Sequence, residues 1–250
     1  LGSGLGAIDE GSILLENWIV KDERESMPAR FPGSVHNAPA AQIAIEFGAR
    51  GLNSAPTAAD ISFEAALWQG MCQLASGEAD CALVGGVDEL NKYPLGIGRR
   101  WGFWTDKTLP GEGAMVAQIV PDRNRRGDEV EAQPAAGNPP PHVGGYLARV
   151  TALRLGRYRR PFEVTREVDW ITAAVDLTRV NAIFSGAKGW PVLEAHYDSM
   201  IAALSVRAGR ALAHHTYKQD CGEFGAASAF GFAATVEWVR ANQCGALLYT

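Results

Sequence analysis

The chain has 250 residues, 47% hydrophobic and 20% charged, so it can bury a large core and is expected to form one large α/β domain or two smaller ones. Its net charge of −5 argues against a dedicated nucleic-acid-binding protein, because such proteins usually carry a basic excess. No apolar stretch approaches the ~20 residues that a membrane-spanning helix needs, and the N-terminus lacks a signal-peptide pattern, so a cytoplasmic protein without membrane contact is expected.

The first part of the chain predicts two helices with a strand between them. Residues 38–49 form the first helix, with Asn37 as its N-cap and Pro39 in its first turn. Residues 51–58 are β-like and contain a proline, which suits a strand paired on one side. Residues 62–76 form the second helix, because apolar and small residues recur along one of its faces: Phe63, Ala66, Leu67, Gly70, Met71 and Leu74.

The middle of the chain predicts three strands and a surface loop. Cys81–Val84 is an apolar run without alternation, which favours a buried parallel strand. Residues 109–122 and 146–155 are expected to be strands on either side of a polar, proline-rich link. This link predicts a surface loop over residues 122–145.

The last part alternates helices and strands. Helices are expected over residues 164–179 and 190–204, with β-like segments at 180–186 and 209–217. A final helix then leads through a polar turn into a strand at 244–249. Alternation of this kind favours a layered α/β fold.

The four cysteines predict no disulfide framework. Cys72, Cys81, Cys221 and Cys244 lie inside or beside apolar runs, and no two of them form a CxxC pair. We therefore expect reduced, buried thiols.

Residues 33 to 90, with "GARGLNSAPTAAD" and "GEADCALVGGVDE", resemble the β-ketoacyl synthase family, especially its chain-length-factor-like and small synthase-like members. The resemblance resumes at "LPGEGAMV", "VNAIFSG" and "HHTYKQDCGEFGAASAFG". It implies a single domain over residues 1–250 with the thiolase-like layered α-β-α-β-α fold. A complete synthase has a further βα portion at the start and a glycine-rich loop at the end, so the domain is expected to be incomplete at both ends.

Three positions of the family's catalytic centre carry other residues in this chain. Counting back from "GEAD", the family's nucleophilic cysteine falls on Asp60. The motif "VNAIFSG" puts Ile183 at the first histidine, and "KQDCGE" keeps Lys218 but puts Glu223 at the second histidine. Decarboxylative condensation needs a thiolate and two imidazole N–H groups. The resemblance therefore implies that ordinary condensing activity is lost.

Simpler structural interpretations of these residues stay open. Asp60 or Ser62 could cap the helix over 62–76, and Lys218 with Glu223 could form a buried ion pair. The small residues after Glu223 are expected to pack closely in a helix between two sheets.

Two further clusters contain residue types that can bind ligands. His214 and His215 with Cys221 fit no standard zinc spacing, so no metal site and no cofactor are predicted. The basic stretch "RLGRYRR" (154–160), with Arg123, Arg125 and Arg126, is usually a solvated face, but it could also steer an acidic acyl carrier protein and touch its phosphopantetheine arm.

The sequence therefore predicts a non-condensing, chain-length-factor-like subunit that pairs with an active ketosynthase in fatty-acid or polyketide-type biosynthesis, or with itself as a homodimer. From the resemblance, the expected dimer interface is Asn53, Ser54, Ala55, Pro56 and Thr57. The alternative is an acyl-transfer or malonyl-decarboxylating enzyme that uses Asp60, Glu223 and Lys218.

Overall fold

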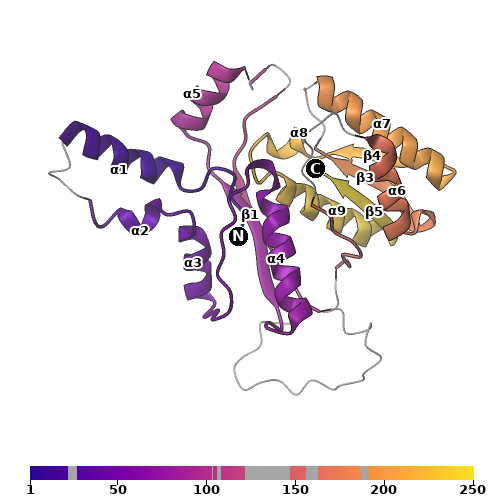
Figure 1. Ribbon diagram of the computed structural model, residues 1–250, viewed down its shortest axis with the longest axis horizontal. Coiled ribbons are helices and arrows are strands. Elements are labelled where there is room, and N and C mark those ends of the chain that lie inside the picture. The colour runs from indigo at the N-terminus through magenta and orange to yellow at the C-terminus, as the bar shows by residue number, and fades with distance from the viewer. Residues whose placement is uncertain (22–26, 103, 106–107, 122–146, 156–162, 187–190) are drawn as a thin grey trace.

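The computed structural model describes the chain except for residues 22–26, 103, 106–107, 122–146, 156–162 and 187–190. Among the described residues, the strands form a two-stranded sheet, β1-β2, and a three-stranded sheet, β4-β3-β5. Helices α1–α3 lie on the left of Figure 1, α4 and β1 in the centre, and the second sheet with α6–α9 on the right. The predicted surface loop over 122–145 lies outside the described residues.

The N-terminal helices are α1 (Ile8–Lys21), α2 (Phe31–Ser34) and α3 (Ala38–Glu46). The last of these confirms the helix predicted over 38–49, with Pro39 in its first turn, although the Asn37 side chain does not cap it. The helix ends at Glu46, and Gly48 follows with a φ of 61°, a left-handed conformation that favours glycine.

Helix α4 (Ser62–Ser76) has the predicted bounds and follows a short 3₁₀ turn, η1 (Ala59–Ile61). Phe63, Ala66, Leu67 and Gly70 of the predicted stripe are buried, and α4 packs on β1. Phe63 and Leu67 form a core with residues of β1 and α9, namely Val84 and Ala229. The helical spacing of apolar residues was therefore a reliable guide to the buried face.

Strand β1 (Ala82–Asp88) pairs antiparallel with β2 (Gly113–Ile119), so the prediction of a parallel strand was wrong for this partner. On its other side, Gly86 makes a parallel bridge with Gly2. An apolar run without alternation identifies a strand that is covered on both faces. It does not determine the direction of the neighbouring strands.

Two other strand predictions were wrong within the described residues. Residues 51–58 are extended but lie in no sheet strand; the carbonyls of Ser54 and Pro56 accept hydrogen bonds from the amino group of Leu1 (2.8 Å) and the N–H of Ser3 (3.2 Å). Residues 147–155 form no helix or strand. A β-like composition alone does not make a strand, because a strand also needs a partner strand with which to pair. Neither segment pairs with a strand among the described residues.

The C-terminal part begins with α6 (Val164–Ala174), which is shorter than the helix predicted over 164–179. Asp176 accepts a hydrogen bond from the N–H of Thr178 and begins a separate 3₁₀ turn, η3 (Leu177–Arg179). The predicted helix at 190–204, the final helix and the strand at 244–249 correspond to α7 (Pro191–Ala208), α9 (Ser228–Asn242) and β5 (Gly245–Tyr249). The β-like segments at 180–186 and 209–217 contain the strands β3 (Val180–Ser185) and β4 (Ala213–Thr216). Helices α5 (Lys92–Trp101) and α8 (Lys218–Cys221) were not predicted.

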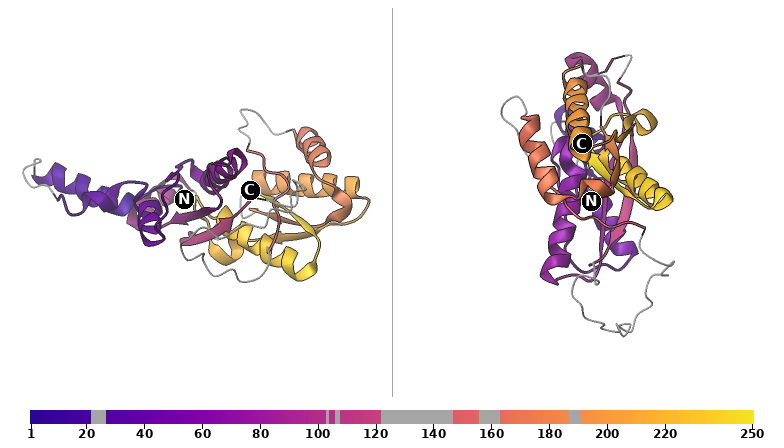
Figure 2. Two further views of the ribbon diagram at one scale, coloured as in Figure 1. Left: turned by 90° about the horizontal axis from the view of Figure 1, so that it is seen from below. Right: turned by 90° about the vertical axis from the view of Figure 1, so that its right-hand side faces the viewer.

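The layers are clearest around α9. This helix contacts strands of both sheets, as predicted for the small-residue segment, while α6 and α7 pack on the opposite face of the three-stranded sheet (Figures 1 and 2). A Cβ at Gly86 would lie 2.9 Å from the Cβ atoms of Ala226 and Ala229, so glycine and alanine set the close approach of α9 to β1.

The four cysteines are free thiols, but Cys72 and Cys81 are exposed and the other two are partly exposed. The prediction of buried thiols was therefore wrong, because Cys72 lies off the buried stripe of α4 and Cys81 precedes β1. None of the helices described here has the length and apolar character needed to cross a membrane.

Candidate functional site

Asp60 lies in the η1 turn, at the start of α4, with an exposed side chain. It does not cap α4, because the N-cap position is Ile61 and no side chain caps there. The capping interpretation of Asp60 was therefore wrong. The preceding residue, Ala59, has a φ of 51°, which is unusual for a residue with a Cβ and indicates local backbone strain.

Ser62 holds this turn instead. Its hydroxyl accepts a hydrogen bond from the N–H of Ala58 (2.9 Å) and is within bonding distance of the carbonyls of Ala59 (2.6 Å) and Ser3 (3.0 Å). Ser62 is fully buried. The position where the family places its nucleophile is thus a fixed turn that presents a carboxylate to solvent.

Ile183 lies away from this turn, in a hydrophobic core. It is 1% exposed and packs with residues of α6 and α7, among them Ile171 and Met200. Side chains alternate along a strand, and the neighbouring Phe184 faces α9, where it contacts Trp238. Ile183 therefore packs on the side of β3 that faces α6 and α7, and its correspondence to a catalytic position of the family stays a prediction.

Gly186, directly after β3, lies beside Lys218 of the Lys218–Glu223 pair and beside the hydroxyls of Tyr197 and Tyr217. This pair, the two tyrosines and Glu64 are called the centre below. A Cβ built on Gly186 would lie 3.0 Å from the Tyr217 hydroxyl, 3.2 Å from Cε of Lys218 and 3.2 Å from the Tyr197 hydroxyl. The motif "VNAIFSG" contained this glycine, but its place at the end of a strand became clear only from the sheet.

Lys218 and Glu223 form the predicted ion pair, with Nζ 2.6 Å from Oε1. Their side chains are 15% and 20% exposed, so the pair is largely shielded from water. The backbone of Glu223 is also fixed, because its N–H donates to the carbonyl of Leu109 (2.7 Å) and its carbonyl accepts from Gly111 (3.1 Å). Glu223 is therefore held by its side chain and its backbone at once.

Three buried residues of the centre were missed by sequence reasoning. Tyr217 and Tyr197 are 4% and 8% exposed, and Glu64 of α4 is 7% exposed. One oxygen of Glu64 accepts a 2.7 Å hydrogen bond from the Thr250 hydroxyl. The only sequence signal was a charged residue inside the apolar stripe of α4, and nothing in the sequence connected it to the tyrosines.

Burial dominates the acid–base properties of these groups. It raises the pKa of the Glu64 carboxyl, an effect that hydrogen bonds from Thr250 and Ser228 and the charge of Lys218 oppose. Burial also raises the pKa values of Tyr197 and Tyr217, and nearby carboxylates, Glu223 among them, add to the rise. Both tyrosines are therefore protonated hydrogen-bond donors at neutral pH.

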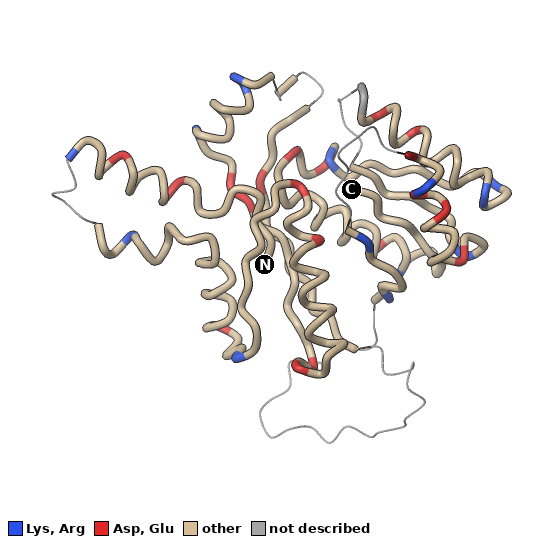
Figure 3. Tube along the Cα trace, in the orientation of Figure 1, with Lys and Arg blue, Asp and Glu red and all other residues tan. Residues whose placement is uncertain are grey.

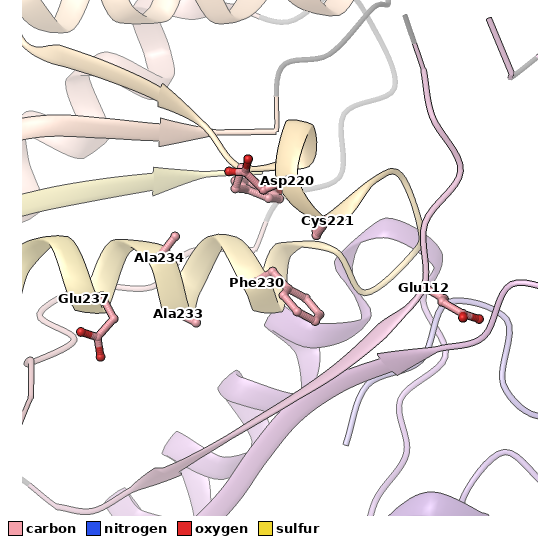
Figure 4. A pocket seen from close by; sticks show the side chains of 8 residues that line it. Glu112, Asp220, Cys221, Phe230, Ala233, Ala234 and Glu237 are labelled. Carbon is pink, nitrogen blue, oxygen red and sulfur yellow. The ribbon is translucent and has the colours of Figure 1, made fainter. Parts of the chain in front are cut away.

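A groove of about 500 Å³ opens beside the centre (Figure 4). Its apolar floor comes from α9 and its acidic residues from three different segments. The lining residues are Glu112, Tyr217, Asp220, Cys221, Phe230, Ala233, Ala234 and Glu237. Tyr217 belongs to both the groove and the centre.

The histidine cluster and the basic stretch form no binding site within the described residues. His214 Nε2 lies 2.8 Å from the Ser185 hydroxyl, and His215 stacks on Phe184 at 4.9 Å, so both histidines have structural partners. In the part of the chain that the structure covers, no group of three or more His, Cys, Asp or Glu side chains is placed to hold a metal ion.

The basic stretch lies largely outside the described residues, as do Arg123, Arg125 and Arg126. Arg154, which is described, forms an ion pair with Glu167 at 3.2 Å and lies over the ring of Trp170. Figure 3 shows acidic and basic residues interspersed along the described chain. Steering of an acidic partner by this stretch stays a prediction.

The fold is similar to that of known ketosynthases. The sequence pattern of the family "Beta-ketoacyl synthase, N-terminal domain" matches residues 2–110. Among solved structures, the ishigamide ketosynthase/chain length factor has a TM-score of 0.68 at 20% identity, covering 96% of this chain and 61% of that one. No curated protein matches.

Two further structures share the fold. One is AntDE:AntF, a type II PKS acyl-carrier protein in complex with its ketosynthase bound to the hexaketide (TM-score 0.70, 13% identity, 96% and 64% covered). The other is the oxazolomycin ketosynthase domain OzmH KS8 of Streptomyces albus JA3453 (TM-score 0.55, 23% identity, 82% and 54% covered). This chain thus spans less than two thirds of the length of each. Residues 2–110 thus resemble the N-terminal domain of the β-ketoacyl synthase family, and the chain has the thiolase-like fold of the ketosynthase structures that it matches.

Proposed function

We propose that this chain is a non-condensing, chain-length-factor-like subunit that pairs with an active ketosynthase in fatty-acid or polyketide-type biosynthesis. The observation that carries the proposal is the Lys218–Glu223 ion pair at 2.6 Å. From the sequence resemblance, Glu223 corresponds to the position where a condensing enzyme needs an imidazole N–H, and a shielded carboxylate there would repel a developing enolate.

The environment of Asp60 supports the same conclusion. A carboxylate does not replace a thiolate as carrier of an acyl chain, and the side chain of Asp60 faces solvent. Because nucleophile and oxyanion donors act as a unit, the loss of several members removes the activity that depends on them. The partner would supply the cysteine and histidines. A ketosynthase/chain length factor is among the structures that share the fold of this chain.

The expected interface has a physical basis in the extended segment 53–57. In an extended chain, the backbone groups of alternate residues point to opposite sides. The carbonyls of Ser54 and Pro56 face residues 1–3, so the backbone groups of Asn53, Ala55 and Thr57 face the other edge. Asn53 also donates its side-chain N–H to the carbonyl of Ala40 at 3.1 Å. A second chain could pair along this edge.

The test is co-expression with a ketosynthase encoded beside it, followed by size-exclusion chromatography. We expect a stable heterodimer that Thr57→Arg weakens at least tenfold, because an exposed position on the proposed edge would carry a bulky charge. Ala75→Arg, on the exposed end of α4, is the matched control and is expected to leave assembly unchanged. A homodimer that binds no ketosynthase would contradict the proposal.

The alternative is an acyl-transfer or malonyl-decarboxylating enzyme. It is tested by measuring malonyl-thioester decarboxylation by this subunit alone, with Asp60→Asn and Glu223→Gln as variants. Activity of the isolated subunit that Asp60→Asn abolishes would support the enzyme and overturn the non-condensing role. We expect no such activity.

A further inference from the structure

Helix α5 presents a basic and partly apolar side to solvent. Arg99 and Arg100 are exposed in its last turn, and the side chains of Ile97 and Trp101 are 44% and 70% exposed. Ile97 and Trp101 are four residues apart, so they lie on the same side of the helix. Neither arginine forms an ion pair with any residue that the structure describes. The helix projects from the body near the top of Figure 1.

The groove of about 500 Å³ carries the opposite charge (Figure 4). Glu112, Asp220 and Glu237 line it with exposed side chains, and half-buried apolar residues of α9, Phe230 among them, line it as well. Within the described residues, the ion pairs of these carboxylates reduce to that of Glu237 with Arg240 at 3.3 Å, which is highly exposed and therefore weak. The groove thus fits an apolar side chain flanked by cations.

The groove and α5 are neighbours in the fold. Oε2 of Glu112 accepts a 2.8 Å hydrogen bond from the N–H of Leu90. Leu90 directly precedes Asn91, whose side chain caps the start of α5. No ion pair joins α5 to the groove within the described chain. Two complementary surfaces that lie close together on one molecule can both be satisfied by a two-fold arrangement of two copies.

We propose that this chain associates with a second copy of itself, with α5 of each copy in the acidic groove of the other. Ile97 and Trp101 contact the apolar residues of α9, while Arg99 and Arg100 pair with the carboxylates of the groove. Charge complementarity sets the orientation. Because each contact is small, the association is weak and reversible. It uses neither segment 53–57 nor a ketosynthase, so it does not rest on the proposed function.

The test is sedimentation velocity of the purified chain at about 1 to 100 µM, the range of weak complexes. The parent protein carries Thr57→Arg, so that pairing through segment 53–57 does not contribute. We expect its sedimentation coefficient to rise with concentration. Arg100→Glu sets a carboxylate against the acidic groove, and Asp220→Lys sets a cation against the basic helix. Each variant alone should associate at least about tenfold more weakly than the parent, because like charges then meet.

An equal mixture of the Arg100→Glu and Asp220→Lys proteins should associate as the parent does, because each helix then faces a groove of opposite charge. Recovery on mixing also excludes misfolding as the cause of the loss. Arg179→Glu and Glu78→Lys make the same charge changes at exposed positions outside both surfaces, and they should leave association unchanged.

Three results would overturn the proposal: the parent sediments as a monomer at every concentration, either reversed variant associates as the parent does, or the mixture associates no better than its components. A monomeric parent that binds an acidic acyl carrier protein through Arg100 would assign α5 to that partner instead. Each of these results can occur whether or not the chain pairs with a ketosynthase.

Discussion

The carboxylate of Asp88 accepts a 2.7 Å hydrogen bond from the backbone N–H of Ala226, 138 residues further along the chain. It also accepts hydrogen bonds from the Ser3 hydroxyl (2.7 Å) and from the N–H groups of Gly4 (3.1 Å) and Leu5 (3.2 Å). Asp88 is 6% exposed. This side chain therefore joins the start of the chain, the end of β1 and the segment before α9.

Asp88→Asn should lower the free energy of unfolding by about 2–4 kcal/mol, because an amide NH₂ would replace one acceptor oxygen and face N–H donors in a buried place. Urea denaturation measures the change. Asp80→Asn, at an exposed position before β1, should change stability by less than about 0.5 kcal/mol. Equal effects of the two substitutions would show that Asp88 does not hold these segments together.

Two glycines provide a matched pair for the close packing of α9. Gly86→Ala should destabilise by about 1–3 kcal/mol, since its Cβ would lie 2.9 Å from two alanine Cβ atoms. Gly96→Ala, in helix α5, has no atom within 4 Å of its added Cβ and should stabilise by up to about 1 kcal/mol. Thermal unfolding of both variants is the measurement, and a stable Gly86→Ala protein would contradict the packing.

Substitutions of Ile183 test whether this residue is part of a hydrophobic core or of a polar site. Ile183→Ala should cost about 2–5 kcal/mol of unfolding free energy, because Ile183 is in a core with α6 and α7. Ile183→His should be at least as damaging, since it buries an imidazole without a polar partner. Ile45→Ala, at an 81% exposed position, is the control and should be nearly neutral. An Ile183→His protein as stable as the wild type would place this residue at the centre after all.

The buried carboxyl of Glu64 predicts a pH dependence of stability. Its pKa is raised in the folded state by burial, so the folded protein binds this proton more tightly than the unfolded chain does. The stabilising contribution is complete below the unfolded value near 4.5 and is lost as the pH rises through the folded pKa. Glu64→Gln, which keeps an acceptor for Thr250, should therefore become more stable relative to wild type as the pH rises.

Urea denaturation of both proteins between about pH 4 and pH 8 measures this difference. Other carboxylates titrate in the same range, but they contribute equally to both proteins and cancel in the comparison. A stability difference that does not change with pH, or one that falls as the pH rises, would contradict the raised pKa.

Much of the local structure could be predicted from the residues themselves. Helix α4 was predicted with its exact bounds because its apolar stripe has helical spacing, and β5 was predicted because a short apolar run follows a polar turn. The segments that contain β3 and β4 were recognised only as β-like. The Lys218–Glu223 pair was also predicted, because the two residues are close in sequence around a turn. These are all interactions over short separations.

The candidate centre required the tertiary structure. Glu64, Gly186 and Tyr217 come from α4, the end of β3 and the start of α8, and no pattern in the sequence connects them. The direction of β2 relative to β1, and the face of β3 on which Ile183 lies, depend on which strands and helices become neighbours. Spacing and propensity act within one element, whereas the packing of distant elements decides which side chains share a buried place. Sequence patterns predicted several of the elements, and the resemblance implied the missing imidazoles. Only the packing of distant elements brings the hydroxyls of Tyr197 and Tyr217 close to Gly186.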